Sequence, residues 1–535
     1  MEKIIQGNLV DLFARSIYHA ELHISGDRIR SIRRLSDIPN TAANFICPGF
    51  VDAHVHIESS LLVPSAFAQL AVAHGTVATI SDPHEIANVC GVEGVDFMIA
   101  NGKQVPFKFH FGAPSCVPAT SFETAGATLD AEAVRKLLER DDIFYLSEMM
   151  NFPGVLHADP EVMAKIAAAK ALNKPVDGHA PGLRGDAAAT YAAAGIQTDH
   201  ECVSHDEGAE KIALGMKILI REGSAARNFD ALIELLRSHP GSIMFCSDDK
   251  HPDSLVEGYI NRLCARAVAL EIDVFDVLRA ACVHPVLHYN MQVGLLREGD
   301  FADFVILKDL ERFDVISTFI NGQAVFADGK SMIPSVDVVP INQFNCEPID
   351  EESLKVSPQR ALLPAIECYD GQLITGSVAV KPGDLQNPDN DLLKIAVINR
   401  YHPAPVATAY IKGFGLKKGA IASSVAHDSH NIIAVGADDT SIVRAVNLVI
   451  RDKGGLSCVD GNTSMVLPLP VAGLMSADDG QKVADAYTAI DRMAKSLGSP
   501  LNAPFMTLSF MALLVIPAVK LSDRGLFDGQ NFRFF

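Results

Sequence analysis

Two histidines near the start of the chain have the type and spacing of metal ligands. They lie in the stretch Pro48–His56, which reads PGFVDAHVH. Alternate side chains of a strand share a face, so His54 and His56 are expected to point the same way. Two imidazoles at the carboxyl end of a strand supply half of a divalent-metal site. A pair alone is a weak signal, so further ligands must come from elsewhere in the chain.

Later apolar runs end in residues of the same chemical kind. These are Asp82, His84, Glu85, Glu148, His179, His200 and Asp248. Taken singly, His179 could cap a helix, His200 could be a rim residue and Asp248 could be an N-cap. Four histidines and two carboxylates at five strand ends can instead hold two divalent ions. Glu148, midway in the series, is placed to bridge them.

The apolar runs alternate with helical stretches, a pattern typical of a parallel α/β fold. The expected strands are Phe50–His56, Val77–Asp82, Phe107–Gly112, Ile143–Glu148, Val176–His179, Ile196–His200, Met216–Ile220 and Ile243–Asp248. The expected helices include Pro64–Ala73, Ala131–Glu139, Pro160–Leu172, Asp186–Ala194 and Phe229–Ser238, with Asp130, Asp159 and Asn228 as N-caps. Eight such units predict a (β/α)8 barrel with its chemistry at the carboxyl ends of the strands. An open doubly wound sheet is the alternative, but no G-x-G-x-x-G follows the first strand.

The chain divides into three predicted domains. The short antiparallel strands of residues 1–45 are expected to pair with those of residues 290–338 in a small β domain, in which Asn321-Gly322 marks a hairpin turn. Residues 46–289 form the catalytic barrel, residues 339–358 a linker, and residues 345–535 an α+β C-terminal domain. The apolar run Phe505–Val519 is too short to span a bilayer and is predicted to be a buried helix.

Composition limits the partners. A net charge of −20 over 535 residues argues against nucleic acid. The N-terminus lacks an apolar signal region, so we expect a cytoplasmic protein with no membrane partner. Ten cysteines without a CxxC pair, among them Cys202, Cys246 and Cys282 in apolar surroundings, indicate reduced core residues. A homo-oligomer is expected.

Several longer motifs resemble those of the adenine deaminase family of the amidohydrolase superfamily. The resemblance covers nearly the whole chain and includes a C-terminal block that other amidohydrolases lack. The matching segments are Pro48–His56, Ser81–Val89, Ser147–Val155, Asp177–Gly182, Arg221–Ser224, Gly413–Ala420, Ser424–Asn431 and Pro504–Phe510.

The resemblance implies a barrel beside a small β-sandwich, a C-terminal domain and two Mn²⁺ or Fe²⁺ ions. It assigns His54, His56 and Asp248 to the first ion, His179 and His200 to the second, and Glu148 to the bridge between them. Many relatives use a carboxylated lysine as the bridge. No lysine stands at the fourth strand end here, which favours the deaminase branch.

The implied reaction is hydrolytic deamination of adenine to hypoxanthine and ammonia, a step of purine salvage. Two divalent ions would lower the pKa of a bound water, and Asp248 would take its proton. A glutamate kept protonated by burial would neutralise a ring nitrogen, with Glu85 ahead of Glu201. Loop residues placed to contact the purine are Ser115, Arg221 and Ser224.

Two alternatives remain open. One is a binuclear deaminase of another amino-purine such as N6-methyladenine, and the other is a non-catalytic metal-binding scaffold protein.

His427, Asp428 and His430 form a dense polar cluster in the last domain. This cluster could close the pocket, hold another ion or form an interdomain hydrogen-bond network.

Overall fold

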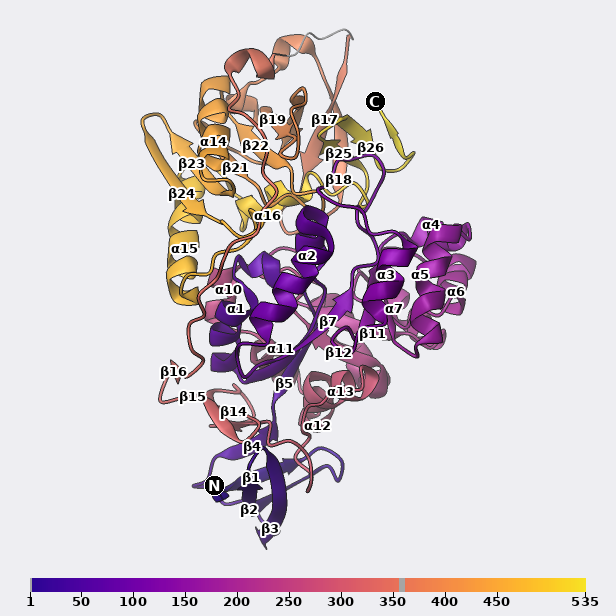
Figure 1. Cartoon of the computed structure of the whole chain (residues 1–535), viewed down its shortest axis with the longest axis vertical. Coiled ribbons are helices and arrows are strands. Elements are labelled where there is room, and N and C mark those ends of the chain that lie inside the picture. The colour runs from indigo at the N-terminus through magenta and orange to yellow at the C-terminus, as the bar shows by residue number, and fades with distance from the viewer. Residues whose placement is uncertain (1, 356–360) are drawn as a thin grey trace.

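The computed structural model describes residues 2–355 and 361–535, so positions 356–358 of the expected linker lie outside the described residues. Figure 1 shows three regions along the long axis: a small β region at one end, a helix-and-strand region in the middle, and a second mixed region at the other end. In the described part of the chain, no helix is long and apolar enough to cross a membrane.

The small β region joins the start of the chain to residues 304–331 in one hydrogen-bonded sheet of eight strands. In sheet order these are β16 (Lys330–Ser331), β15 (Gln323–Ala327), β14 (Val315–Ile320), β13 (Phe304–Leu307), β4 (Phe45–Pro48), β1 (Glu2–Asp11), β2 (Ser16–Ser25) and β3 (Arg28–Ser36). β4 pairs antiparallel with β13, so the predicted pairing of the two segments is confirmed. Asn321 and Gly322 both have positive φ, as the expected tight turn between β14 and β15 requires.

The middle region is a curled parallel sheet covered by helices. Its strands are β5 (Phe50–Val55), β6 (Thr76–Ser81), β7 (Lys108–Ala113), β8 (Tyr145–Met149) and β9 (Val176–Gly178) in one group, and β10 (Thr198–Asp199), β11 (Lys217–Arg221) and β12 (Ile243–Cys246) in another. Backbone hydrogen bonds connect the groups at both edges: Gln197 donates to Val176 at 2.9 Å, and Asp248 donates to His54 at 2.9 Å.

Helices follow most of these strands, close to the predicted positions. They are α1 (Pro64–Ala71), α2 (His84–Gly102), α3 (Ala131–Leu138), α4 (Phe152–Leu156), α5 (Pro160–Ala171), α6 (Gly185–Ala193), α7 (His205–Ala213), α8 (Phe229–Leu232), α9 (Leu235–Ser238), α10 (Pro252–Glu257), α11 (Ile260–Ala269), α12 (Val274–Leu278) and α13 (His284–His288). Asp130 and Asp159 accept hydrogen bonds from the first turns of α3 and α5, as predicted. Asn228 does not cap α8; its side chain instead accepts from Arg221 N and donates to His200 O and Cys202 O.

The C-terminal region contains a second eight-stranded sheet. Its order is β18 (Thr375–Val380), β17 (Leu363–Cys368), β20 (Ala407–Lys412), β19 (Leu393–Ile398), β22 (Ile432–Gly436), β21 (Ala420–Ser423), β23 (Gly455–Asp460) and β24 (Thr463–Pro468). The remaining elements are α14 (Asp439–Arg451), α15 (Gly480–Ser496), α16 (Pro504–Phe510), β25 (Val519–Ser522), β26 (Gly525–Asp528) and β27 (Arg533–Phe534). The expectation of one helix over Phe505–Val519 is wrong, since α16 ends at Phe510 and β25 begins at Val519. Pro517 has no backbone N–H for a helical hydrogen bond, which disfavours continuation of the helix.

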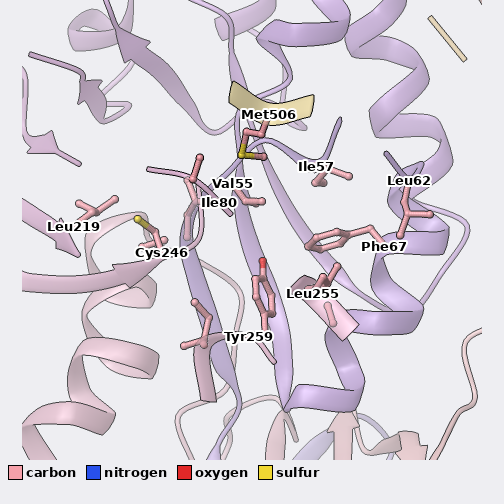
Figure 2. Packing of buried hydrophobic residues seen from close by; sticks show 14 of the residues in the cluster. Val55, Ile57, Leu62, Phe67, Ile80, Leu219, Cys246, Leu255, Tyr259 and Met506 are labelled. Atoms are coloured by element: carbon pink, nitrogen blue, oxygen red, sulfur yellow. The ribbon is translucent and has the colours of Figure 1, made fainter. Parts of the chain in front are cut away.

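The middle and C-terminal regions share one hydrophobic core. Val55 of β5, Ile80 of β6 and Met506 of α16 belong to the same buried cluster, and Figure 2 shows them together with Phe67 and Tyr259. Cys202, Cys246 and Cys282 are buried and free, as predicted. This continuous apolar contact holds the C-terminal region against the carboxyl ends of the parallel strands.

Replacing Met506 with alanine tests this contact. Met506 is 1% exposed, and truncating a buried methionine costs about 2–5 kcal/mol. We expect Met506→Ala to lower the melting temperature measured by scanning calorimetry. Met332→Ala is the control, because Met332 is 57% exposed. Equal melting temperatures for both variants would contradict the shared core.

Candidate metal centre and active site

The carboxyl ends of β5 and β12 bring the first group of metal-type ligands together. His54 Nε2 lies 3.2 Å from His56 Nε2. Asp248 Oδ1 lies 3.6 Å from the first of these nitrogens and 3.2 Å from the second. Asp52 fixes the approach of the two strands, since its carboxylate accepts hydrogen bonds from Ser247 N, Ser247 Oγ and Tyr259 OH.

Glu148, in β8, faces imidazoles on both of its oxygens. Oε1 lies 3.3 Å from His56 Nε2, in the first group. Oε2 lies 2.7 Å from His179 Nδ1 and 3.1 Å from His200 Nε2, which follow β9 and β10. The structure thus brings all six residues of the expected ligand set together around one buried carboxylate.

His54 and Glu148 already have the protonation state of metal ligands without an ion, whereas three other groups of this set do not. Although burial opposes it, the neighbouring carboxylates raise the pKa of His56, His179 and His200, so these rings must release a proton when a cation binds. Burial and the neighbouring His200 and His56 hold the pKa of His54 well below its ordinary value, which leaves the ring neutral. Burial opposes ionisation of Glu148, but His179 and His200 hold its pKa well below the usual range. Neutral imidazole and ionised carboxylate are the ligating forms of these side chains. An imidazole and carboxylate set of this kind suits transition-metal ions such as Mn²⁺, Fe²⁺ or Zn²⁺.

Arg221 ties Asp248 to Glu201. Its Nη1 lies 2.6 Å from Asp248 Oδ2, and its Nη2 lies 2.9 Å from Glu201 Oε2. Burial disfavours an ionised Asp248, but the Arg221 guanidinium holds the pKa of this carboxyl well below its usual range. Arg221 is buried between the two carboxylates, and its hydrogen bond to Asp248 orients that side chain. The expected contact between Arg221 and a purine stays a prediction.

The two predicted serine contacts also lie behind the ligands. Ser115 Oγ donates to the backbone oxygen of Glu148. Ser224 Oγ lies 3.0 Å from Ser254 Oγ and accepts from His251 N at 2.9 Å. Both serines are buried. Their contacts support the loops of the site, and a direct contact with substrate stays a prediction for both.

His84 and Asp82 enlarge the ligand cluster beyond the predicted six residues. His84 Nδ1 lies 3.1 Å from Asp82 Oδ2 and 3.5 Å from Glu148 Oε1. His56, Asp82, His84 and Glu148 together could hold a cation. Both residues stand in the SDPHE motif at the end of β6 and were named among the strand-end residues of metal-ligand type. The sequence did not indicate that His84 lies beside Glu148.

Glu85 is held by the C-terminal region. His427 Nδ1 contacts its Oε1, and His430 Nε2 contacts its Oε2. Burial alone would raise the pKa of Glu85, but these imidazoles and His84 hold it well below the usual range. The expectation that burial keeps Glu85 protonated is therefore wrong. Glu85 raises the pKa of His427 to about 9 despite burial, so the proton resides on the imidazole.

A narrow cavity opens onto these groups. Ligand residues form one wall: His56, His84, Glu148, His179, His200 and Asp248. The C-terminal region supplies Leu373, His427, Asp428, Phe510 and Leu513 on the other. The cluster His427–His430 thus lies at the site, and Leu373, Phe510 and Leu513 make this side of the cavity apolar.

A parallel α/β region with imidazoles and carboxylates at its strand ends defines a metal-dependent hydrolase of the amidohydrolase class. Residues 45–325 match the family model "Amidohydrolase family", and residues 372–533 match "Adenine deaminase C-terminal domain". The chain belongs to the adenine deaminase family of these proteins, as the following relatives show.

Three relatives named adenine deaminase are similar over their full length. The protein of Salinibacter ruber is 55% identical over 99% of this chain and 98% of its own. Those of Sulfurovum sp. and Methanosarcina acetivorans are 53% and 50% identical, each over 99% of this chain and 98% of its own. The predicted family is confirmed, and the family implies a divalent metal.

Replacing the shared carboxylate tests the metal centre. Two ions at this site stay a prediction, and Glu148→Gln would remove the charge expected to lie between them, so bound metal after dialysis is expected to fall from two equivalents to one or fewer. Elemental analysis after Mn²⁺ loading measures it. Glu123→Gln is a matched control: Glu123 is buried, its pKa is raised well above its usual value chiefly by burial, and it lies outside the ligand set. Retention of two ions by Glu148→Gln would contradict the bridging role.

Proposed function

We propose that this chain catalyses the metal-dependent hydrolytic deamination of adenine to hypoxanthine and ammonia. The observation that carries the proposal is the carboxylate of Glu148, whose two oxygens face two separate groups of imidazoles. Full-length relatives that bear the name adenine deaminase support the choice of substrate. A small-molecule purine is then the partner, and purine salvage, a cytoplasmic location and a homo-oligomer stay predictions.

We propose the following layout for this activity. The strands β5–β12 form a (β/α)8 barrel over residues 46–289, supported by the backbone bonds at both junctions of the parallel strands. Residues 1–45 and 290–338 form the small β-sandwich domain, and residues 345–535 form the C-terminal domain. The barrel carries the ligands, and the C-terminal domain closes the cavity above them.

We assign the ligands to two ions, Mn²⁺ or Fe²⁺. His54, His56 and Asp248 hold one, His179 and His200 hold the other, and Glu148 lies between them. When bound, such ions supply positive charge that lowers the pKa of a bound water towards neutrality.

The side chains around the ligands move the protons. Asp248 Oδ1 accepts the proton of the attacking water and returns it to the departing amine, while Arg221 fixes Oδ2. His427 holds the proton at rest, and Glu85, which contacts it, relays that proton to a ring nitrogen. The second proton of the attacking water restores it when ammonia leaves. Glu201 is the weaker candidate because both of its oxygens contact Arg221, a guanidinium that does not release a proton.

An assay of released amine tests the proposal. The Mn²⁺-loaded full chain is expected to convert adenine to hypoxanthine with one ammonia per turnover. N6-methyladenine is assayed in parallel for methylamine. Methylamine release without ammonia release would favour the other amino-purine, and no turnover with either would favour the scaffold protein.

Replacing Asp248 tests the assignment of the base. Asp248→Asn is expected to lower kcat on adenine by about 10² to 10⁴, because an amide cannot take the proton. Its metal content must first match that of the wild type, since loss of an ion would mimic loss of the base. A drop of less than about tenfold in the metal-loaded variant would show that the proton leaves by another route.

A further inference from the structure

Asp428 lines the cavity and carries one buried carboxylate oxygen that has no hydrogen-bond partner among the described residues. The residue is 3% exposed and lines the cavity wall opposite the ligands. Its Oδ1 lies 3.5 Å from His84 Nε2. Among residues 2–355 and 361–535, neither Asp428 Oδ2 nor His84 Nε2 has a hydrogen-bond partner.

Two other acidic residues that line the cavity differ from Asp428. Both oxygens of Glu85 are engaged by His427 and His430, and both oxygens of Glu201 are engaged by Arg221. A buried carboxylate oxygen without a donor is destabilising. Its place beside the ligands indicates that the donor is a group of the substrate.

The position of Asp428 indicates which hydrogen-bond donor of the substrate lies beside it. The His84 ring separates it from the shared carboxylate, because Nδ1 lies 3.5 Å from Glu148 Oε1 and Nε2 lies 3.5 Å from Asp428 Oδ1. A carboxylate can only accept hydrogen bonds, and adenine offers two donors: the amino group at C6 and the N–H of the five-membered ring. The amino group must face the ligands for reaction, which leaves the ring N–H for the far side of His84.

We propose that Asp428 accepts a hydrogen bond from the five-membered ring N–H of a purine base and thereby selects free bases over nucleosides. In a nucleoside the sugar replaces this hydrogen, so the bond is lost and the carboxylate stays buried without a donor. This inference rests on the proposed function only in taking a purine as the ligand.

Equilibrium binding of hypoxanthine and 9-methylhypoxanthine tests it without turnover. Both are titrated by calorimetry into the metal-loaded full chain as wild type, Asp428→Asn and Asp491→Asn. Asp491 is a matched control in α15: it is buried, its Oδ1 lacks a partner among the described residues, it pairs with Lys495 at 2.6 Å, and it does not line the cavity. Asparagine keeps the shape of aspartate and removes the charged acceptor.

The wild type and Asp491→Asn are expected to bind hypoxanthine at least about tenfold more tightly than its 9-methyl derivative. Asp428→Asn should weaken the binding of hypoxanthine by about 10- to 100-fold and change the binding of 9-methylhypoxanthine by less than about threefold. Equal weakening of both ligands, no weakening, or a wild type that binds neither would overturn the proposal. A protein that shows the expected selectivity but releases no ammonia from adenine keeps this proposal and loses the proposed function.

Discussion

The site depends on one buried carboxylate that several imidazoles share. Clustered imidazoles deep in a protein repel one another when protonated and lose hydration when neutral, so an anion among them is required. Glu148 supplies that charge from β8, while His56, His179 and His200 approach from three other strand ends. The neighbouring strands must therefore all end along the same edge of the sheet. In a parallel sheet, the carboxyl ends of the strands lie together at one edge.

A second layer of polar contacts fixes these strand ends. Asp52 ties β5 to the segment after β12, and Asn228 ties the end of β11 to the residues after β10. Arg221 restrains Asp248 from behind. Such contacts determine where the ligand atoms lie, and a loss in any of them would spread the ligands apart.

The clustering of the six candidate ligands was predictable because strand ends can be read from local patterns. His54, His56, Glu148, His179, His200 and Asp248 each follow or end a short apolar run, and parallel strands place such ends together. The same patterns did not give the ionisation of Glu85, which depends on His427, 342 residues away along the chain. The patterns also did not predict that Arg221 contacts two carboxylates or that Asn228 connects two loops. Contacts made by loop residues leave no periodic signal in the sequence.

Closure of the cavity by Leu373, His427, Asp428 and Phe510 also orders events during protein synthesis. A chain leaves the ribosome from its N-terminus, and its domains generally fold in that order. The strands that carry the candidate ligands emerge well before residues 427 and 510, so a nascent chain exposes this cluster to solvent for as long as the last region is being translated. A cation that reached the cluster in that interval would not have to pass through the narrow cavity, whereas loading of the finished chain must use it.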